Sequence, residues 1–299
     1  MIKLITHNDL DGIGCYIVLR TLLDDDIDVE YCNYQEVNDV ALDTLSNEEK
    51  YEKIYITDIS VTEDVADRLD TISNKLVLLD HHVTALFLNK YKWANVKEYE
   101  DEEKTCGTKL LYNYIFDNYS NIKTNDTLNE FVWKTKLYDT WLWADKYDDV
   151  SAKYLNDLMY IIGKETFIEE MAYKIISNSA LFNDFDLKLL EIKQREIDDY
   201  VEKKNKYLIK TNILGYNAGI VFAESNISEL GNKLCNMNPE LDLVIMINQK
   251  GISYRTAKDN VNVSEIAKQF GVGGHPKASG SSMPNDCLER FISDLFKQQ

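Results

Sequence analysis

The feature that most constrains the fold is a series of short apolar segments that alternate with helix-like segments in the N-terminal part of the chain. Lys3–Thr6, Lys53–Thr57 and Lys75–Leu79 are rich in apolar residues without strand-like alternation, and helix-like stretches at Gly12–Leu23 and Val61–Leu69 separate them. Strands that are apolar on both sides are typical of a parallel sheet covered by helices on both faces. The sequence therefore predicts an α/β domain built on a parallel sheet.

The middle of the chain has a different pattern. Residues 105–180 are mainly helix-like, and the strongly charged segment Asp186–Leu208 places apolar Leu190, Ile197 and Val201 on one helical face. We interpret this segment as a helix that connects two domains. An ordinary surface helix would have the same pattern.

The remainder of the chain predicts a second, smaller α/β domain. Gly219–Ala223, Leu243–Ile247 and Ile252–Arg255 are strand-like, Val263–Phe270 is helix-like, and Gly271–Gly280 is expected to be a glycine-rich loop. A length of 299 residues also fits two domains, at roughly 100–200 residues each. We expect a parallel-sheet domain with a helical insertion, a connecting helix and a smaller α/β domain, with bounds at 1–184, 185–209 and 210–299.

The charge balance excludes one class of partner. The chain has 51 acidic and 33 basic residues, a formal net charge of −18. Proteins that bind long nucleic acids neutralise phosphates with Lys and Arg, so we expect no such partner. A short substrate held by a few cations remains compatible with the composition, because bound divalent ions reverse the local charge of an acidic site.

No targeting or membrane segment is visible in the sequence. The first residues run directly into polar His7 and Asn8, and no apolar run approaches the ~20 residues of a membrane span. The five cysteines are odd in number and include no CxxC pair, so we expect reduced thiols. We expect a soluble, cytoplasmic protein with no membrane partner.

All four histidines of the chain lie beside aspartate or glycine clusters. His7 follows the first predicted strand in THNDLDG, His81 and His82 follow the third in LLDHH, and His275 lies in GVGGHPKASG. A lone histidine has many ordinary roles. The shared placement of all four therefore indicates a role in catalysis or ligand binding.

Carboxylates gather at the same strand ends. Asp9 and Asp11 follow the first predicted strand, Asp58 the second and Asp80 the third. Open α/β sheets bind ligands outside the carboxyl ends of their strands, so these side chains should meet at one edge. Divalent cations would relieve the repulsion between them, and mixed imidazole and carboxylate ligands suit Mn, Fe or Zn. Taken singly, Asp11 or Asp58 would more often be a helix cap or turn residue than a ligand.

The glycine-rich segment is a candidate phosphate site. Gly273 and Gly274 allow close backbone approach, and successive free N–H groups in such a turn bind anions. His275 and Ser279 could add hydrogen-bond donors, and Lys277 could add a positive charge.

Together, THNDLDG, YITDIS, LLDHH and LYDTW resemble the four motifs of the DHH phosphoesterases, and GVGGHPKASG resembles the signature loop of the type 1 DHH-associated domain. The resemblance covers most of the chain in the right order. The group includes RecJ exonucleases, nanoRNases of the NrnA and NrnB kinds, cyclic-dinucleotide phosphodiesterases and family II inorganic pyrophosphatases. Here the first motif is spaced His-x-Asp-x-Asp, closer to the RecJ layout than to the His-x-x-x-Asp-x-Asp of the nanoRNase and pyrophosphatase branches.

The resemblance implies a centre of two divalent metal ions, Mn²⁺ first among them. It implies that one ion is held by His7, Asp9 and Asp58, and the second by Asp11, Asp58, His81 and Asp139. Asp80, His81 and His82 are then the catalytic and orienting groups. Arg255 matches the family's substrate-facing arginine, beside Gly273, Gly274, His275, Lys277 and Ser279. Gly107 and Thr108 match a stretch that begins a helix facing the active site, and Trp141 or Trp143 could stack on a base or simply pack internally.

The implied function is hydrolysis of a short oligonucleotide or small nucleotide, such as nanoRNA, a dinucleotide or adenosine 3′,5′-bisphosphate, by a water that two metals activate. The chain would act as a monomer or homodimer. Alternatives are a cyclic-dinucleotide phosphodiesterase, a family II pyrophosphatase, a RecJ-like exonuclease on long strands, and a catalytically inactive nucleotide-binding module. The GGHPKASG loop opposes the pyrophosphatase, and the acidic, short chain opposes the long-strand exonuclease.

Overall fold

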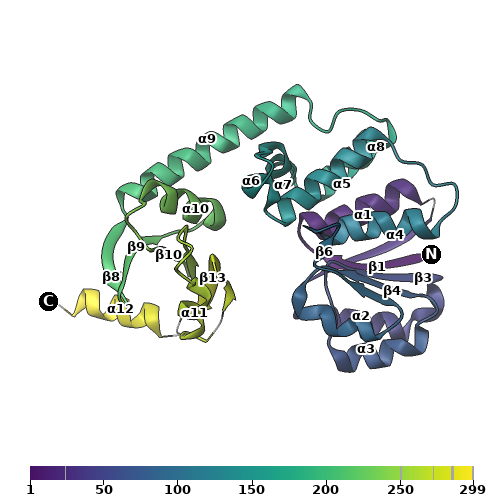
Figure 1. Cartoon of the computed structure of the whole chain (residues 1–299), viewed down its shortest axis with the longest axis horizontal. Coiled ribbons are helices and arrows are strands. Elements are labelled where there is room, and N and C mark those ends of the chain that lie inside the picture. Colours follow the sequence, from purple (N-terminus) through teal and green to yellow (C-terminus); the bar gives the residue numbers. More distant parts are fainter. Residues whose placement is uncertain (24, 250, 272, 284–285, 298–299) are drawn as a thin grey trace. The chain divides into compact units, whose positions relative to one another are not determined.

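The computed structural model describes residues 1–23, 25–249, 251–271, 273–283 and 286–297, leaving aside the side chains at 288, 291 and 295. It divides into two compact units, Met1–Leu190 and Glu191–Gln299 (Figure 1), each with its own sheet. The expected α/β architecture, with a parallel-sheet domain and a smaller second sheet, is confirmed.

The N-terminal unit is built on a five-stranded sheet in the order β2-β1-β3-β4-β5, and every pairing in it is parallel. The three strands that the apolar runs predict lie at its centre, with nearly all their side chains buried. The strands are β1 (Ile2–His7), β2 (Ile27–Cys32), β3 (Lys53–Thr57), β4 (Leu76–Asp80) and β5 (Ala94–Val96).

The edge strand β2 was not expected from the sequence. It is only partly buried, and its acidic residues Asp28 and Glu30 bind the Lys3 ammonium at 3.1 and 2.9 Å. An edge strand with ionic side chains lacks the continuous apolar run of a central strand. Lys53–Thr57 is therefore the third strand of the chain and not the second.

Helices cover both faces of this sheet (Figure 1). Leu10–Leu22 (α1) and Gly107–Asn118 (α4) pack on one face, and Val37–Ser46 (α2) and Glu63–Leu69 (α3) pack on the other. The connections contain short 3₁₀ helices and a hairpin of two short strands. These elements are η1 (Glu48–Lys50), η2 (Asp70–Ile72), η3 (Val83–Lys90), β6 (Tyr99–Glu100) and β7 (Glu103–Lys104).

Beyond α4, the predicted helical region packs as a layer against the outer side of α1. Its buried leucine, phenylalanine and methionine side chains form one cluster with Leu10, Ile13 and Ile17 of α1. The layer comprises α5 (Asp126–Asp139), α6 (Leu142–Asp145), α7 (Val150–Ile162) and α8 (Lys164–Ile176). Its importance for the site is that α5 ends at Asp139.

The strand order sets the position of any ligand. The chain passes from β1 outward to β2 and then returns to place β3 on the other side of β1. Connections therefore diverge to opposite faces between β1 and β3, and such a switch point is where open α/β sheets bind their ligands. The segments after β1 and β3 carry Asp9, Asp11 and Asp58.

The helix α9 (Asp184–Lys206) runs from one unit into the other. Leu190 is buried in the N-terminal helical cluster, whereas Ile197 and Val201 are buried in the core of the C-terminal unit, so the predicted apolar face is used by both units. None of the helices in the described part of the chain combines the length and the hydropathy that a membrane-spanning helix requires.

The C-terminal unit has a six-stranded mixed sheet in the order β12-β13-β11-β10-β9-β8. Its strands are β8 (Ile209–Ile213), β9 (Tyr216–Phe222), β10 (Leu243–Ile247), β11 (Gly251–Arg255), β12 (Gly274–His275) and β13 (Ala278–Ser282). Its helices are α10 (Ile227–Met237), α11 (Val263–Lys268) and α12 (Cys287–Phe296).

The expectation of a loop over Gly271–Gly280 is wrong in part. Residues 274–275 and 278–282 form an antiparallel hairpin at the sheet edge, with Pro276 and Lys277 at the turn. Glycine and proline are uncommon in strands, so composition favours a loop here. The strands exist because β13 pairs along its whole length with β11. Val272 of this segment lies outside the described residues.

Gly12 allows α1 to lie against the end of β1. A Cβ added at Gly12 would lie 2.0 Å from the carbonyl oxygen of His7, which is rigid backbone. Although alanine normally favours a helix over glycine by about 1 kcal/mol, we expect Gly12→Ala to lower the free energy of unfolding by about 1–3 kcal/mol or more. Urea denaturation measures this change, and a variant as stable as the parent would contradict the close packing.

Candidate metal centre

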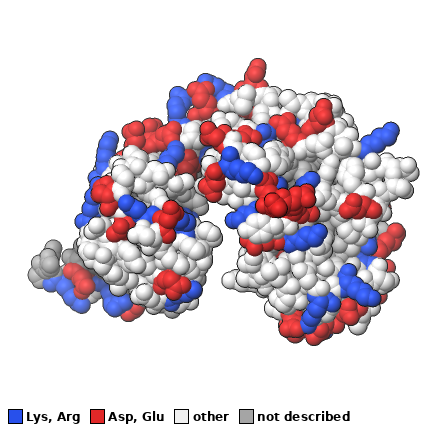
Figure 2. Space-filling view, in the orientation of Figure 1, with Lys and Arg blue, Asp and Glu red and all other residues white. Residues whose placement is uncertain are grey.

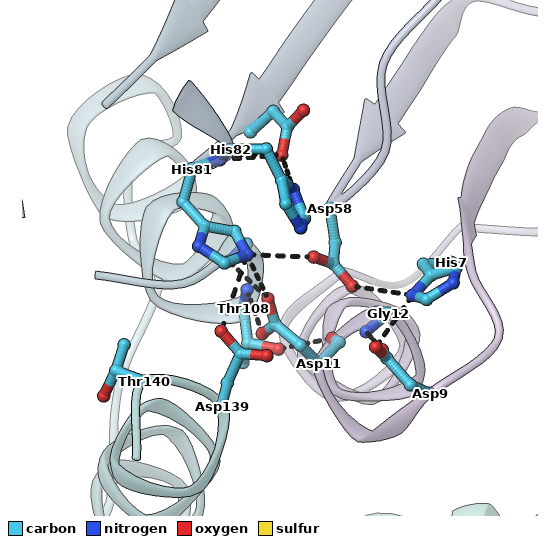
Figure 3. Close-up of polar contacts among 12 residues, drawn as sticks. His7, Asp9, Asp11, Gly12, Asp58, His81, His82, Thr108, Asp139 and Thr140 are labelled. Carbon is cyan, nitrogen blue, oxygen red and sulfur yellow. Dashed lines mark hydrogen bonds and ion pairs between the residues drawn. The ribbon is translucent and has the colours of Figure 1, made fainter. Parts of the chain in front are cut away.

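The predicted ligands meet at the carboxyl edge of the N-terminal sheet. His7, Asp9 and Asp11 come from the β1–α1 junction, Asp58 and His81 follow β3 and β4, and Asp139 ends α5 (Figure 3). Figure 3 shows the side chains converging on a common space, with Thr140 directed away from it.

One group of donor atoms forms around His7. Its Nδ1 lies 2.7 Å from Asp9 Oδ2 and 3.8 Å from Asp58 Oδ2. Asp9 is also the N-cap of α1, because its Oδ1 accepts a hydrogen bond from the Gly12 amide at 3.1 Å. The helix cap therefore uses one oxygen of Asp9, while the other oxygen faces His7.

A second group forms around His81. Its Nε2 lies 3.2 Å from Asp58 Oδ1, 3.5 Å from Asp139 Oδ2 and 3.9 Å from Asp11 Oδ2. Asp58 thus has one oxygen toward each group. Ligand atoms within the sets His7–Asp9–Asp58 and Asp11–His81–Asp139 all lie within 4.8 Å of one another, and the same holds for a third set, Asp58–Asp80–His81–His82.

The N-terminus of α4 holds Asp11 in place. Oδ2 and Oδ1 of Asp11 accept hydrogen bonds from the amides of Gly107 and Thr108 at 2.5 and 2.8 Å, and the Thr108 hydroxyl donates to the Asp11 carbonyl at 2.6 Å. The free amides and dipole of a helix N-terminus stabilise a carboxylate. The predicted position of Gly107 and Thr108 at a helix start beside the site agrees with this arrangement.

Two carboxylates in the cluster lack compensation from the protein. Both Asp58 Oδ2 and Asp139 Oδ2 are buried, and no described residue provides a hydrogen bond to either. Burial, followed by the charges of Asp11 and Asp9, raises the pKa of both Asp58 and Asp139 well above its usual range. Ionising either group inside the bare protein is therefore unfavourable.

The backbone at Asp58 is also strained. Its φ of 57° lies in the left-handed region, which aspartate and asparagine tolerate better than most residues. Such conformations cost about 1–3 kcal/mol and cluster at functional sites. In this conformation Asp58 places Oδ2 toward His7 and Oδ1 toward His81.

These observations fit divalent cations. Buried carboxylate oxygens without donors need positive charge, and burial, opposed mainly by the Asp11 charge, lowers the pKa of His81 so that its ring is neutral, as metal coordination requires. Imidazole and carboxylate donors together suit Mn, Fe or Zn, whereas purely oxygen sites suit Mg or Ca.

Asp80 and His82 lie beside the cluster with their polar atoms engaged. Asp80 Oδ1 accepts from the amides of His81 and His82 and from His82 Nδ1 at 2.8 Å, and its Oδ2 accepts from the Ser60 hydroxyl. Burial opposes ionisation of Asp80, but the hydrogen bond and charge of His82 prevail and lower its pKa. Asp80 is suited to orienting its neighbours.

Sequence reasoning missed one residue that lies against this cluster. Tyr34 follows β2, and its hydroxyl lies 3.1 Å from His82 Nε2. It belongs to none of the acidic or histidine motifs. The overlooked strand β2, whose last residue Cys32 pairs with His7, is the signal that would have placed it.

The predicted phosphate residues belong to the C-terminal unit. Arg255 is paired with Ala278, which is paired with His275, so the three stand in register across β11, β13 and β12. Lys277 instead binds Asp259 at 2.7 Å, and the Ser279 hydroxyl donates to the His275 carbonyl at 3.1 Å. Gly274 pairs with Ser279, and Gly273 directly precedes β12.

Family models match both units. Residues 1–134 match the model of the DHH family, N-terminal domain, and residues 212–299 match that of the DHHA1 domain. Oligoribonuclease NrnB of Bacillus subtilis (strain 168) is 36% identical over 307 residues, which cover 99% of this chain and 76% of the relative. The chain belongs to the DHH family. It is a phosphoesterase, a hydrolase of phosphoester bonds.

Solved structures share the fold of this DHH chain at low identity. The pGpG-specific phosphodiesterase PggH of Vibrio cholerae has a TM-score of 0.55 and 15% identity, with 100% of this chain and 98% of that chain covered. Exonuclease RecJ bound to manganese has a TM-score of 0.54 and 13% identity, with 98% and 88% covered.

The uncompensated carboxylates predict an unusual response to substitution in this DHH protein. Because Asp58 has a raised pKa, its folded form binds a proton more readily than its unfolded form, so it destabilises the metal-free fold as pH rises above the unfolded value. We expect Asp58→Asn to raise the Tm of the metal-free protein at pH 8 by about 2–4 °C per kcal/mol of repulsion removed. The same variant should lose most of the Tm gain that Mn²⁺ gives the parent.

Thermal unfolding at pH 6 and pH 8, with chelator and with Mn²⁺, measures both effects. Asp43→Asn, at an exposed aspartate on α2, is the matched control and should change neither. A metal-free Asp58→Asn protein that is less stable than the parent at pH 8 would show that Asp58 is not under electrostatic strain.

The junction of α4 with the cluster predicts a second effect. A Cβ at Gly107 would lie 2.7 Å from the Asp58 Cβ and 3.0 Å from Asp11 Oδ2. We expect Gly107→Ala to displace both carboxylates and to weaken Mn²⁺ binding by about 10–100-fold, as loss of groups that orient ligands does. Isothermal titration calorimetry tests this, and unchanged affinity would refute the close contact.

Proposed function

We propose that this DHH phosphoesterase hydrolyses very short oligoribonucleotides, dinucleotides included, with the help of two divalent cations, Mn²⁺ first among them. The proposal rests mainly on the position of Asp58. This buried residue has a strained backbone and directs one oxygen toward each of two groups of donor atoms. The identity to oligoribonuclease NrnB along nearly the whole chain supports the substrate class.

In this proposal His7, Asp9 and Asp58 hold one cation, and Asp11, Asp58, His81 and Asp139 hold the other. Two such cations, when bound, supply a water of lowered pKa and neutralise charge on the phosphoryl group. The remaining roles belong to the chain. Asp80 orients His81 and His82 by accepting hydrogen bonds from both amides. We assign His82 to the substrate side of the cluster.

The C-terminal unit is proposed to bind the substrate's phosphate. Arg255 has no carboxylate partner among the described residues, and its guanidinium bonds only the Tyr254 carbonyl and the Ser228 hydroxyl there. A guanidinium without a carboxylate can bind a phosphate in a bidentate manner. His275 stands in register with Arg255 across β13, so we assign both to the phosphate-binding group, together with the backbone at Gly273 and Gly274. The expected part of Ser279 is not supported, because Ser279 pairs with Tyr254 and its buried side chain faces the other side of the sheet. Lys277 is the weakest member, because Asp259 neutralises it.

The charge distribution supports a short substrate. On the face shown in Figure 2, Lys and Arg are interspersed with Asp and Glu and do not form a continuous basic strip. With a net charge of −18, the chain is poorly suited to long-range attraction of a polyanion. Affinity must then come from a few local contacts, which favours small substrates.

The decisive experiment is a panel of substrates with Mn²⁺, read by product mass. We expect turnover of an RNA dinucleotide to exceed that of a 30-mer, a cyclic dinucleotide and pyrophosphate, because the few phosphate contacts suit short linear chains. Asp58→Ala should abolish all metal-dependent hydrolysis, while Asp43→Ala should retain it.

Each alternative has its own result in this panel. Preference for the 30-mer would indicate a long-strand exonuclease, preference for a cyclic dinucleotide a cyclic-dinucleotide phosphodiesterase, and preference for pyrophosphate a pyrophosphatase. Binding of nucleotide without turnover would indicate an inactive module. Full activity in Asp58→Ala would reject the site itself.

A further inference from the structure

Tyr34 lies on a well-fixed turn at the active edge of the sheet. It stands between β2 and α2, where the Asn33 carbonyl accepts hydrogen bonds from the amides of Glu36 and Val37 at 3.0 and 3.1 Å. The Asn33 amide donates in turn to the Glu36 carboxylate at 3.0 Å. The turn is closed on both sides, so Tyr34 has a defined position although 56% of it is exposed.

The tyrosine contacts two histidines from different strand ends. Its ring centroid lies 5.2 Å from that of His7, and its ring stands edge-on to His82 at 5.9 Å. The hydroxyl lies 3.1 Å from His82 Nε2. Tyr34 thus spans the junction between the His7 side and the Asp80–His82 side of the cluster.

The opposite nitrogen of His82 is already committed. Asp80 Oδ1 lies 2.8 Å from His82 Nδ1 and takes a hydrogen bond from it, since the ionised carboxylate can only accept. In the neutral ring, Nε2 is then the acceptor and takes the tyrosine O–H. In the charged ring, Nε2–H donates to the tyrosine oxygen. A hydroxyl can do both, so the contact persists in either protonation state.

Burial, followed by the charges of Asp58 and Asp80, raises the pKa of Tyr34, so its hydroxyl keeps its proton. An imidazole bonded at both nitrogens cannot rotate freely about its Cβ–Cγ bond. With only Asp80 attached, rotation would be limited by one bond alone. Preorganised side chains of this kind lower the reorganisation needed at the moment of reaction.

We propose that Tyr34 is a positioning residue, whose hydroxyl together with Asp80 fixes the plane of the His82 imidazole beside the carboxylate cluster. The expected effect of Tyr34 on turnover rests on the proposed function, whereas its hydrogen bond to His82 does not depend on that function. It assigns the β2–α2 turn a part in the active site, beside the three strand ends that carry the acidic and histidine motifs.

Tyr34→Phe tests the hydroxyl, and Tyr34→Ala tests the ring as well. We expect Tyr34→Phe to lower kcat on an RNA dinucleotide by roughly 2- to 10-fold, the effect of one hydrogen bond, with KM and Tm little changed. Tyr173→Phe, at a tyrosine on α8 that is 72% exposed, is the matched control and should behave as the parent.

Nitrogen-15 NMR of the histidine side chains provides a readout that does not depend on hydrolysis. The chain has only four histidines, so the His82 signals can be assigned by substitution. We expect the Nε2 signal of His82 to shift in metal-free Tyr34→Phe, with His275 unchanged.

The proposal fails if the His82 Nε2 signal is the same in Tyr34→Phe as in the parent. It also fails if Tyr34→Phe retains full kcat while Tyr34→Ala loses it, because the ring alone would then act. A parent protein that hydrolyses no member of the panel would reject the proposed function, while the NMR comparison would still decide whether the tyrosine holds the histidine.

Discussion

Electrostatic repulsion among buried carboxylates is the constraint on which this structure depends. Asp11, Asp58 and Asp139 lie around one imidazole nitrogen of His81, and two of their oxygens have no donor among the described residues. The folded chain tolerates this repulsion because other parts of the structure hold the carboxylates in place. The α4 N-terminus stabilises Asp11, a left-handed turn fixes Asp58, and the strand order brings both to one edge. The negative charge that the protein leaves uncompensated favours the binding of cations at this site.

Much of the fold follows from the sequence because central parallel strands have a simple pattern. β1, β3 and β4 are buried on both faces, so most of their residues are apolar, and the aspartates at or just after their ends mark the edge where the donor groups meet. Asp139 could be anticipated only by resemblance, since nothing in the spacing of α5 shows that its last residue reaches a site formed by strands. Its position depends on packing between α5 and α1.

The residues that escaped prediction share a physical reason. β2 alternates charged and apolar residues because it lies at the edge, and its acidic side chains are matched by Lys3 from the neighbouring strand. Without β2 there was no cause to suspect Tyr34. Apart from His275, the strands of the β12–β13 hairpin consist of glycine, serine and alanine, whose intrinsic preference for strands is weak, and the hairpin is specified by pairing with β11. In both cases the strand is specified by a partner that is distant in sequence, and a local sequence pattern does not show that partner.

The attachment of Asp11 to α4 has a consequence for how this enzyme could change over evolution. Both oxygens of this carboxylate accept hydrogen bonds from amides of another helix, so a substitution that alters the proposed metal site at Asp11 would also loosen α4 from the sheet. Asp139 has no comparable structural role, because it stands at a helix end and accepts no hydrogen bond from a backbone amide of another element among the described residues. A lineage that acquires a new metal preference is therefore expected to vary first at position 139 and to keep position 11 fixed.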